Sequence, residues 1–227
     1  MSKKMLEEKT IDEVKHAKIL SLNAACDAIP DSIDGTDLLI VRFNAESEDQ
    51  LVFAGYMAGM AASAKVRFTV GVIITADEPD SVFSICYDTV ICISSEVEAD
   101  QAVKTLIESC SQKSISCLDF MDIMWVIHCG GIGYFAYSEK DYQAGNLAEM
   151  AKELIRKSSM KEKIANAKRL LVCINRGSGG EEAGFEELNS AVESFYEVIS
   201  EGANIIFPVL SERTGGKVSI GVIATGF

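Results

Sequence analysis

Two carboxylates in the second half of the chain have a spacing that could support catalysis. Asp119 and Asp122, in the segment CLDFMDI, are three residues apart, so a helix would carry both on one face. A carboxylate within one hydrogen bond of a water molecule orients it and accepts its proton, which is worth about 10²–10⁴-fold in rate. Acidic residues in the first turn of a helix also cap N–H groups and complement the helix dipole. The residues alone leave both roles open.

The acidic segment NAESEDQ, residues 44–50, follows a short apolar run and is a second candidate. It contains no glycine and carries Glu46, Glu48 and Asp49. Phosphate-binding loops use glycine so that backbone N–H groups can approach the oxygens, and three carboxylates would repel a polyphosphate unless a metal ion lay between them. No GxGxxG or GxxxxGK[ST] pattern occurs in the chain. The sequence therefore predicts no phosphate-binding loop of either kind.

Two weaker motifs have structural explanations. His128 beside Cys129 could suggest a nucleophile pair, but adjacent helical residues point about 100° apart. No partner carboxylate is evident, so we expect a packed histidine at the end of a helix. The segment GSGGEE, residues 177–182, is typical of a strand-to-helix turn, because Glu181 and Glu182 argue against an anion site.

The charge and composition exclude several classes of function. The 227 residues include 21 Lys and Arg and 34 Asp and Glu, which gives a net charge of −13. Nucleic-acid binding needs a basic footprint, and anionic membrane surfaces repel an acidic protein. The apolar stretches are shorter than the ~20 residues of a membrane span. The N-terminal residues are charged and do not have the pattern of a signal peptide. Seven cysteines without a CxxC pair predict a reduced, cytoplasmic protein with neither disulfides nor a metal site.

The hydrophobic pattern predicts an α/β fold. Apolar runs rich in β-branched residues alternate with helical stretches, and this order favours a parallel sheet covered by helices. A charged segment with helical spacing, residues 3–29, is predicted to form one helix before the first strand. The predicted strands are 37–43, 68–75, 88–94, 131–138, 169–175, 204–212 and 217–227. The other predicted helices are 51–65, 96–110, 118–127, 141–157 and 185–200.

The order and spacing of these segments resemble the tubulin/FtsZ family. VSIGVIATGF, RLLVCINRGSGGEEAGFEELNSAVESF and GGIGYFAYSEKDYQAGNLAEMAKELI are similar to parts of the family's C-terminal domain. AVKTLIESCSQKSISCLDFMDI resembles the family's central helix and the synergy loop after it. DGTDLLIVRF and FTVGVIIT resemble two strands of its GTPase domain. The resemblance covers residues 30–227.

The resemblance implies three parts and two site residues. These parts are a truncated FtsZ-like nucleotide domain of Rossmann type at 1–96, a central helix with the synergy-loop lead-in at 97–114, and an FtsZ-like C-terminal α/β domain at 115–227. In the family, two synergy-loop acids reach into the next subunit's nucleotide site and polarise the attacking water. The matching residues are Asp119 and Asp122, which are the predicted catalytic residues, whereas Cys117 replaces the family's asparagine.

Three departures from the family concern the nucleotide. NAESEDQ stands where the family has a glycine-rich phosphate loop. The family's opening strand and helix, with their own glycine-rich loop, have no counterpart before residue 30. The base-stacking position falls near Glu96, where a polar residue without negative charge is expected. We therefore predict no cofactor and a non-enzymatic, degenerate FtsZ/tubulin-like protein. It would form homo-oligomers or cap or regulate the filament of an FtsZ-type homologue.

Two other functions stay open. The chain could be a divergent cell-division GTPase that binds GTP with Mg²⁺, the metal bridging the acidic loop to phosphate. It could also be a scaffold that binds small molecules or other subunits, because fold alone does not fix function. A truncated nucleotide domain is further expected to leave a sheet edge or apolar face uncovered. The predicted helix at 3–29 would cover it, in its own subunit or in a neighbour.

Overall fold

The computed structural model describes residues 17–76, 86–111, 114–116, 118–128, 131–178, 181–210 and 216–227. These residues form a mixed α/β fold in which strands and helices alternate, as predicted. None of the helices in these ranges is long and apolar enough to cross a membrane. In chain order the elements are β1 (Ile19–Asn23), β2 (Leu38–Asn44), α1 (Glu48–Ala64), β3 (Phe68–Ile74), β4 (Thr89–Ile93), α3 (Glu96–Ser111), α4 (Phe120–Ile127), β5 (Ile132–Asp141), α5 (Asn146–Arg156), α6 (Ser158–Asn166), β6 (Arg169–Asn175), β7 (Gly177–Ser178), β8 (Glu181–Glu182), α7 (Phe185–Tyr196), β9 (Asn204–Ile206), β10 (Val209–Leu210) and β11 (Lys217–Thr225).

One sheet connects the two halves of the chain. Its strands follow the order β1-β2-β3-β4-β5-β11-β6-β10, and β9 also pairs with β6. Strands β1 to β5 are parallel to one another, whereas β11 runs antiparallel to both β5 and β6. Because β4 pairs with β5, the hydrogen-bond ladder continues from the first half into the second. The division at residues 96 and 114 stays a prediction.

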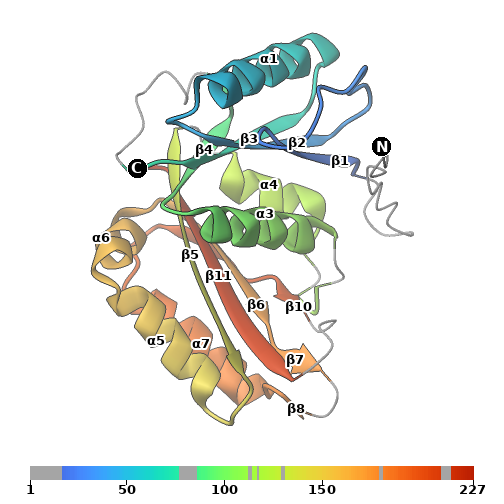
Figure 1. Ribbon diagram of the computed structural model, residues 1–227. Helices are drawn as coiled ribbons and strands as arrows, with labels where there is room; N and C mark the ends of the chain where they lie inside the picture. Colours follow the sequence, from blue (N-terminus) through green and yellow to red (C-terminus); the bar gives the residue numbers. More distant parts are fainter. Residues whose placement is uncertain are drawn as a thin grey trace.

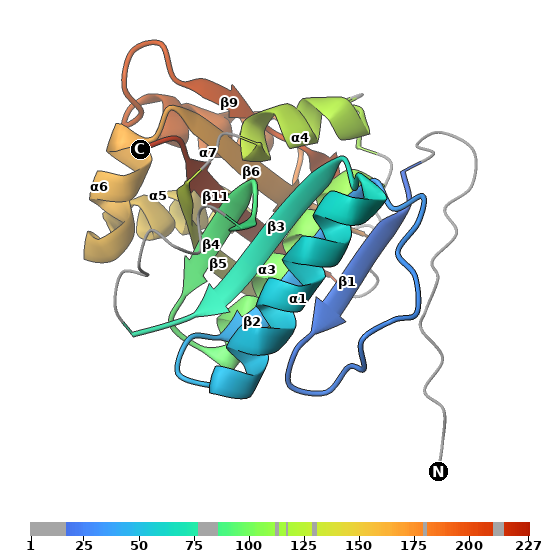
Figure 2. The same cartoon turned by 90° about the horizontal axis from the view of Figure 1, so that it is seen from above.

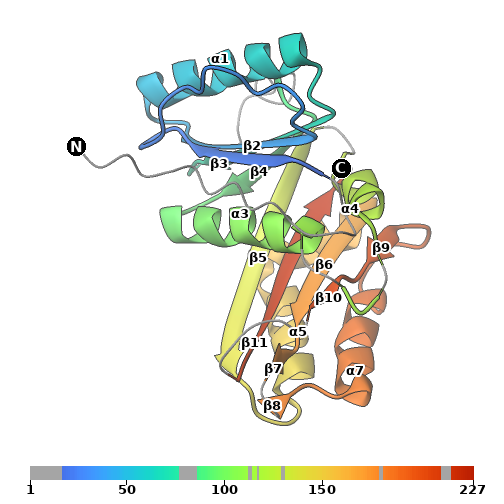
Figure 3. The ribbon, with the colours of Figure 1, turned by 90° about the vertical axis from the view of Figure 1, so that its right-hand side faces the viewer.

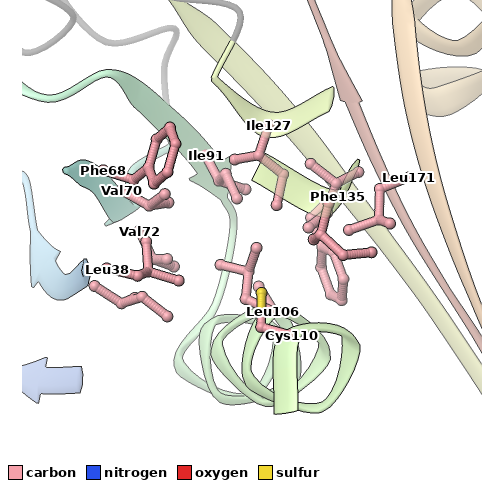
Figure 4. Packing of buried hydrophobic residues seen from close by; sticks show 14 of the residues in the cluster. Leu38, Phe68, Val70, Val72, Ile91, Leu106, Cys110, Ile127, Phe135 and Leu171 are labelled. Carbon is pink, nitrogen blue, oxygen red and sulfur yellow. The ribbon is translucent and has the colours of Figure 1, made fainter. Parts of the chain in front are cut away.

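Helices cover the sheet on both faces (Figure 1). Helix α1 covers one face of β1 to β4, whereas α3 and α4 cover the other. Helices α5, α6 and α7 cover β5, β11 and β6. Helix α3 packs on both halves, with Leu106 and Cys110 lying between Val72 of β3 and Phe135 of β5 (Figure 4). On the α1 side, the Tyr87 hydroxyl donates to the Ala54 carbonyl at 2.8 Å, and burial raises the pKa of Tyr87.

Helix α3 approaches strand β11 closely. A Cβ on Gly221 would lie 2.8 Å from both Cγ2 and Oγ1 of Thr105, and Thr105 is itself buried. That distance is shorter than carbon and oxygen atoms tolerate without moving. Only glycine therefore lets the helix backbone lie this near to the strand.

The predicted helix at 3–29 is wrong where the structure describes it. Residues 19–23 form strand β1, which pairs in parallel with β2, and a turn follows. Leu20 and Leu22 face α1 whereas Ile19 faces α3, which is the two-residue alternation of a strand. The helical spacing was misleading because pairing with β2, a tertiary contact, decides the local structure. Residues 3–16 of that predicted helix lie outside the described residues.

Two other elements differ from their predictions. The predicted strand at 204–212 is two short strands, β9 and β10, separated by Phe207 and Pro208. Proline has no N–H to give to a ladder, so the strand is interrupted there while both pieces still pair with β6. Helix α6 was not predicted, because the amphipathic pattern of α5 weakens before it.

Candidate functional site

The loop between β2 and α1 lies where sheets of this kind bind ligands, at the carboxyl ends of the parallel strands (Figure 2). Each backbone N–H from Asn44 to Ser47 donates to an acceptor of the chain itself. Four consecutive donors are therefore engaged internally and are not directed at a ligand. Their acceptors are, in order, Gln50 Oε1 at 2.9 Å, Ile74 O at 2.9 Å, Asn44 Oδ1 at 2.8 Å and Asn44 O at 3.3 Å.

The three acids predicted from NAESEDQ lie together at the start of α1. Glu46, Glu48 and Asp49 are exposed, and Glu48 and Asp49 belong to the first helical turn. Ser47 is the N-cap, and its side chain accepts from the Gln50 N–H. The positive end of a helix dipole attracts phosphate, but here carboxylates already complement it. Within the described ranges, no group of three or more His, Cys, Asp or Glu side chains is placed to hold a metal ion.

A buried arginine links the sheet to the start of α3. Arg42 on β2 is 9% exposed, and its guanidinium forms ion pairs with Glu96 and Asp100 of α3. Glu96, the residue near the predicted base-stacking position, is therefore bound to Arg42. This network was not predicted from the sequence. The sequence did contain a sign of it, because Arg42 is the single cation in the apolar run DLLIVRF and a buried charge needs a partner.

Asp119 and Asp122 form a reciprocal cap at the start of α4. The Asp122 N–H donates to Asp119 Oδ1 at 2.9 Å, and the Asp119 N–H donates to Asp122 Oδ2 at 2.9 Å. This arrangement is a capping box. Both residues are exposed, so each keeps carboxylate surface toward solvent. The cap is thus present in the structure, and the catalytic role predicted for the two acids stays a prediction.

The loop before α4 is anchored to the connection between β9 and β10 (Figure 3). Ser114 Oγ accepts from the Val209 N–H at 3.0 Å, and the Ile115 N–H donates to Val209 O at 2.9 Å. The Ser116 hydroxyl donates to Phe207 O at 2.8 Å. These bonds hold the segment that leads to Asp119. Cys117 lies outside the described residues.

Two exposed apolar side chains lie on the same helix as the two acids. Met121 and Trp125 are 40% and 50% exposed and lie one helical turn apart on α4. The Arg169 guanidinium lies 4.6 Å from the centre of the Trp125 ring and bonds the Trp125 carbonyl. We define the α4 face as Asp119, Met121, Asp122 and Trp125. Tryptophan and arginine are enriched among the residues that contribute most to protein interfaces.

His128 does have a carboxylate partner, contrary to the expectation from sequence. It is the C-cap residue of α4, and its Nδ1 lies 3.5 Å from Asp88 Oδ1. The other Asp88 oxygen accepts from the N–H and hydroxyl of Thr69 at 2.7 and 3.0 Å. The pair therefore joins the end of α4 to the start of β4. Cys129 lies outside the described residues, so the structure does not test the alternative of a nucleophile pair.

Replacing Asp119 by Ala should lower the free energy of unfolding by about 0.5–2 kcal/mol, because the Asp122 N–H loses its acceptor. Replacing it by Ser should have a much smaller effect, because Ser is also a good N-cap residue. Urea unfolding of the three proteins measures both changes. Equal stability of the Ala and Ser variants would contradict a capping role.

No protein-family model matches the chain. The cell division protein FtsZ 1 of Halobacterium salinarum is 28% identical over 190 residues, which are 83% of this chain and 46% of that protein. FtsZ of Haloferax mediterranei is 26% identical over 190 residues and 48% of its length. The chain therefore spans about half the length of the curated relatives it matches.

The chain is also similar in fold to solved structures of FtsZ and TubZ. A mutant FtsZ from M. jannaschii superposes with a TM-score of 0.67 at 18% identity, over 85% of this chain and 66% of that one. TubZ of Bacillus thuringiensis serovar israelensis, solved as GDP-form protofilaments, superposes with a TM-score of 0.58 at 12% identity, over 84% and 61%. In sequence and in fold, the chain is FtsZ/tubulin-like.

Proposed function

We propose that this cytoplasmic protein does not bind GTP tightly and acts by association, with copies of itself or with a filament of an FtsZ-type homologue. The loop at residues 44–47 carries this proposal. Its four consecutive N–H groups donate within the chain, and Glu48 and Asp49 occupy the first turn of α1. A polyphosphate would have to break these bonds and approach two carboxylates.

The ion pairs at the start of α3 support the same proposal. Glu96 and Asp100 are held by Arg42, so the start of α3 is bound to the sheet by the chain's own side chains. A neutral nucleotide base that replaced these contacts would leave a buried arginine without its carboxylate partners, which is strongly unfavourable.

The α4 face supports the association part of the proposal. TubZ, which shares the fold, was solved as protofilaments. Filaments of identical subunits use head-to-tail interfaces, in which one face of a subunit binds a different face of the next. A subunit that has the α4 face but no nucleotide-binding face would bind at one end of the filament only. It would therefore act as a cap or regulator of that filament.

Calorimetry with GTP and GDP, each with and without Mg²⁺, tests the proposal. We expect no binding near the micromolar range, about −8 kcal/mol. A variant with Glu46→Gln, Glu48→Gln and Asp49→Asn should also fail to bind, because the four N–H groups remain engaged. Micromolar binding by the natural chain would contradict the proposal. If that binding required Mg²⁺, it would favour the divergent GTPase, a role consistent with the exposed Asp119 and Asp122.

A further inference from the structure

The outward face of α1 lacks charge. From Gln50 to Ala64 the helix contains no acidic or basic residue, and Val52 and Tyr56 on this face are 67% and 54% exposed. Figure 1 shows α1 as the outermost layer over β1 to β3. A helix on the surface of a globular protein normally turns charged residues outward. This one presents a stripe without charge about 22 Å long, at 1.5 Å per residue over the 15 residues from Gln50 to Ala64.

Two glycines lie on the same face without an internal reason. A Cβ on Gly55 or on Gly59 would meet no atom of the chain within 4 Å. Glycine inside a helix is less stable than alanine, and here packing within the chain does not require it. One helical turn apart, the two residues leave room for another backbone to lie close against α1.

A groove with acidic edges runs beside this stripe. It has a volume of about 710 Å³ and lies between the loop at residues 31–34 and the second half of α1, with Tyr56, Gly59 and Met60 among its lining residues. Asp31 and Asp34, both exposed, form its edge on the loop side. Glu48 and Asp49 lie at the other end of the stripe, at the start of α1. The surface is therefore apolar along its length, with four acids at the start of α1 and on the loop edge. Two cations lie nearby: Lys65 is the exposed C-cap of α1, and the Lys18 ammonium donates to the Asp34 carbonyl at 3.2 Å.

We propose that this groove binds a basic amphipathic helix of a partner protein. Its apolar side would cover Val52, Tyr56 and the two glycines, and its Lys or Arg residues would approach Asp31 and Asp34. Helices that lie in apolar grooves use this combination of an apolar stripe and complementary charge. Helix α4 lies on the opposite face of the sheet, so the groove and the α4 face can be occupied together.

The negative charge around the groove argues against two other occupants, a second copy of the chain and a membrane surface. A second copy packed face to face on this surface would bring the same acids against Asp31 and Asp34. A membrane surface is anionic on its cytoplasmic side and would be repelled for the same reason. Only a partner with basic residues beside its apolar stripe gains from both features of the groove.

The first test uses a synthetic 20-residue amphipathic helix of leucine and lysine, with the same peptide carrying glutamate for lysine as its control. Fluorescence anisotropy with the full chain should detect binding of the lysine peptide only. Val52→Glu should weaken that binding at least tenfold. Val97→Glu on α3 is the matched control, since Val97 is also 67% exposed, and it should leave the binding unchanged. Tighter binding by both variants would mean attraction to net charge alone, because each variant adds a carboxylate, and equal weakening would mean that the groove is not the binding site. Either result would overturn the proposal.

The second test concerns the acidic edge. Asp31→Asn with Asp34→Asn should weaken peptide binding and reduce its dependence on salt, because exposed charges act over a Debye length. Glu193→Gln with Glu197→Gln on α7 removes the same charge elsewhere and should change neither. Sedimentation of the chain without peptide completes the test. A dimer that Val52→Glu dissociates would assign the groove to a second copy and overturn the proposal.

Discussion

Replacing Glu96 and Asp100 together by Ala should lower the free energy of unfolding by about 2–4 kcal/mol. Arg42 would then be a buried cation without its carboxylate partners, and loss of one partner of a buried pair usually costs about 3–5 kcal/mol. The expected value is somewhat smaller because Glu96 and Asp100 are 56% and 71% exposed, so water reaches this end of the network. Urea unfolding monitored by circular dichroism measures the change.

Two further variants separate the buried charge from other effects. Adding Arg42→Met to the double variant should restore most of the stability, because an apolar side chain of similar length fills the same space without charge. Glu48→Ala with Asp49→Ala on α1 also removes two acids from the start of a helix but leaves no buried cation. It should cost only about 0.3–1 kcal/mol per residue through the helix dipole. A triple variant no more stable than the double one would contradict this account of Arg42.

Replacing Asp119 and Asp122 together by Asn should abolish any stimulation that this protein gives to GTP hydrolysis by an FtsZ-type homologue. A positioned carboxylate that accepts a proton contributes about 10²–10⁴-fold, and the amide of Asn cannot accept that proton. Asn still accepts a hydrogen bond as an N-cap residue, so the capping box and the stability should be kept. Phosphate release by a mixture of this chain and the homologue measures the effect.

The choice of Asn separates the two roles of these acids. Because the structure places both in a capping box, alanine variants would change stability whether or not the acids act on a neighbour. Asp31→Asn with Asp34→Asn, on the other side of the sheet, is the charge-matched control and should leave hydrolysis unchanged. An unchanged rate with the Asp119 and Asp122 variant would leave only the structural role.

The elements that the sequence predicted well are those with a strong local pattern. The apolar runs that become β2, β3, β4, β6 and β11 are buried on both faces, and such strands are continuous in hydrophobicity. Strand β1 failed because it is short and only partly buried at the edge of the sheet. Its five residues carry too little pattern to outweigh the helical spacing of their neighbours, and β2 supplies the partner that makes them a strand.

The candidate site, too, could be predicted only where it depends on residues close in sequence. The position of Asp119 at the start of a helix follows from residues close in sequence, and so did the expectation of a cap. In the loop at 44–47, one N–H group donates to Ile74 O, and this carbonyl lies beside the loop only because β2 pairs with β3. The sequence can indicate that Arg42 needs partners, but the partners come from α3, which the fold brings beside β2. These long-range contacts could not be predicted from local spacing.

The contact of Gly221 with Thr105 restricts how this sequence can vary. The two residues share one small volume between β11 and α3, although the chain separates them widely. A methyl group at position 221 needs the side chain at position 105 to shrink, so a lineage has to change position 105 before position 221. Thr105 in turn cannot be exchanged for a larger residue while β11 keeps its place. We therefore expect a substitution at position 221 to be tolerated only where position 105 already holds a smaller residue.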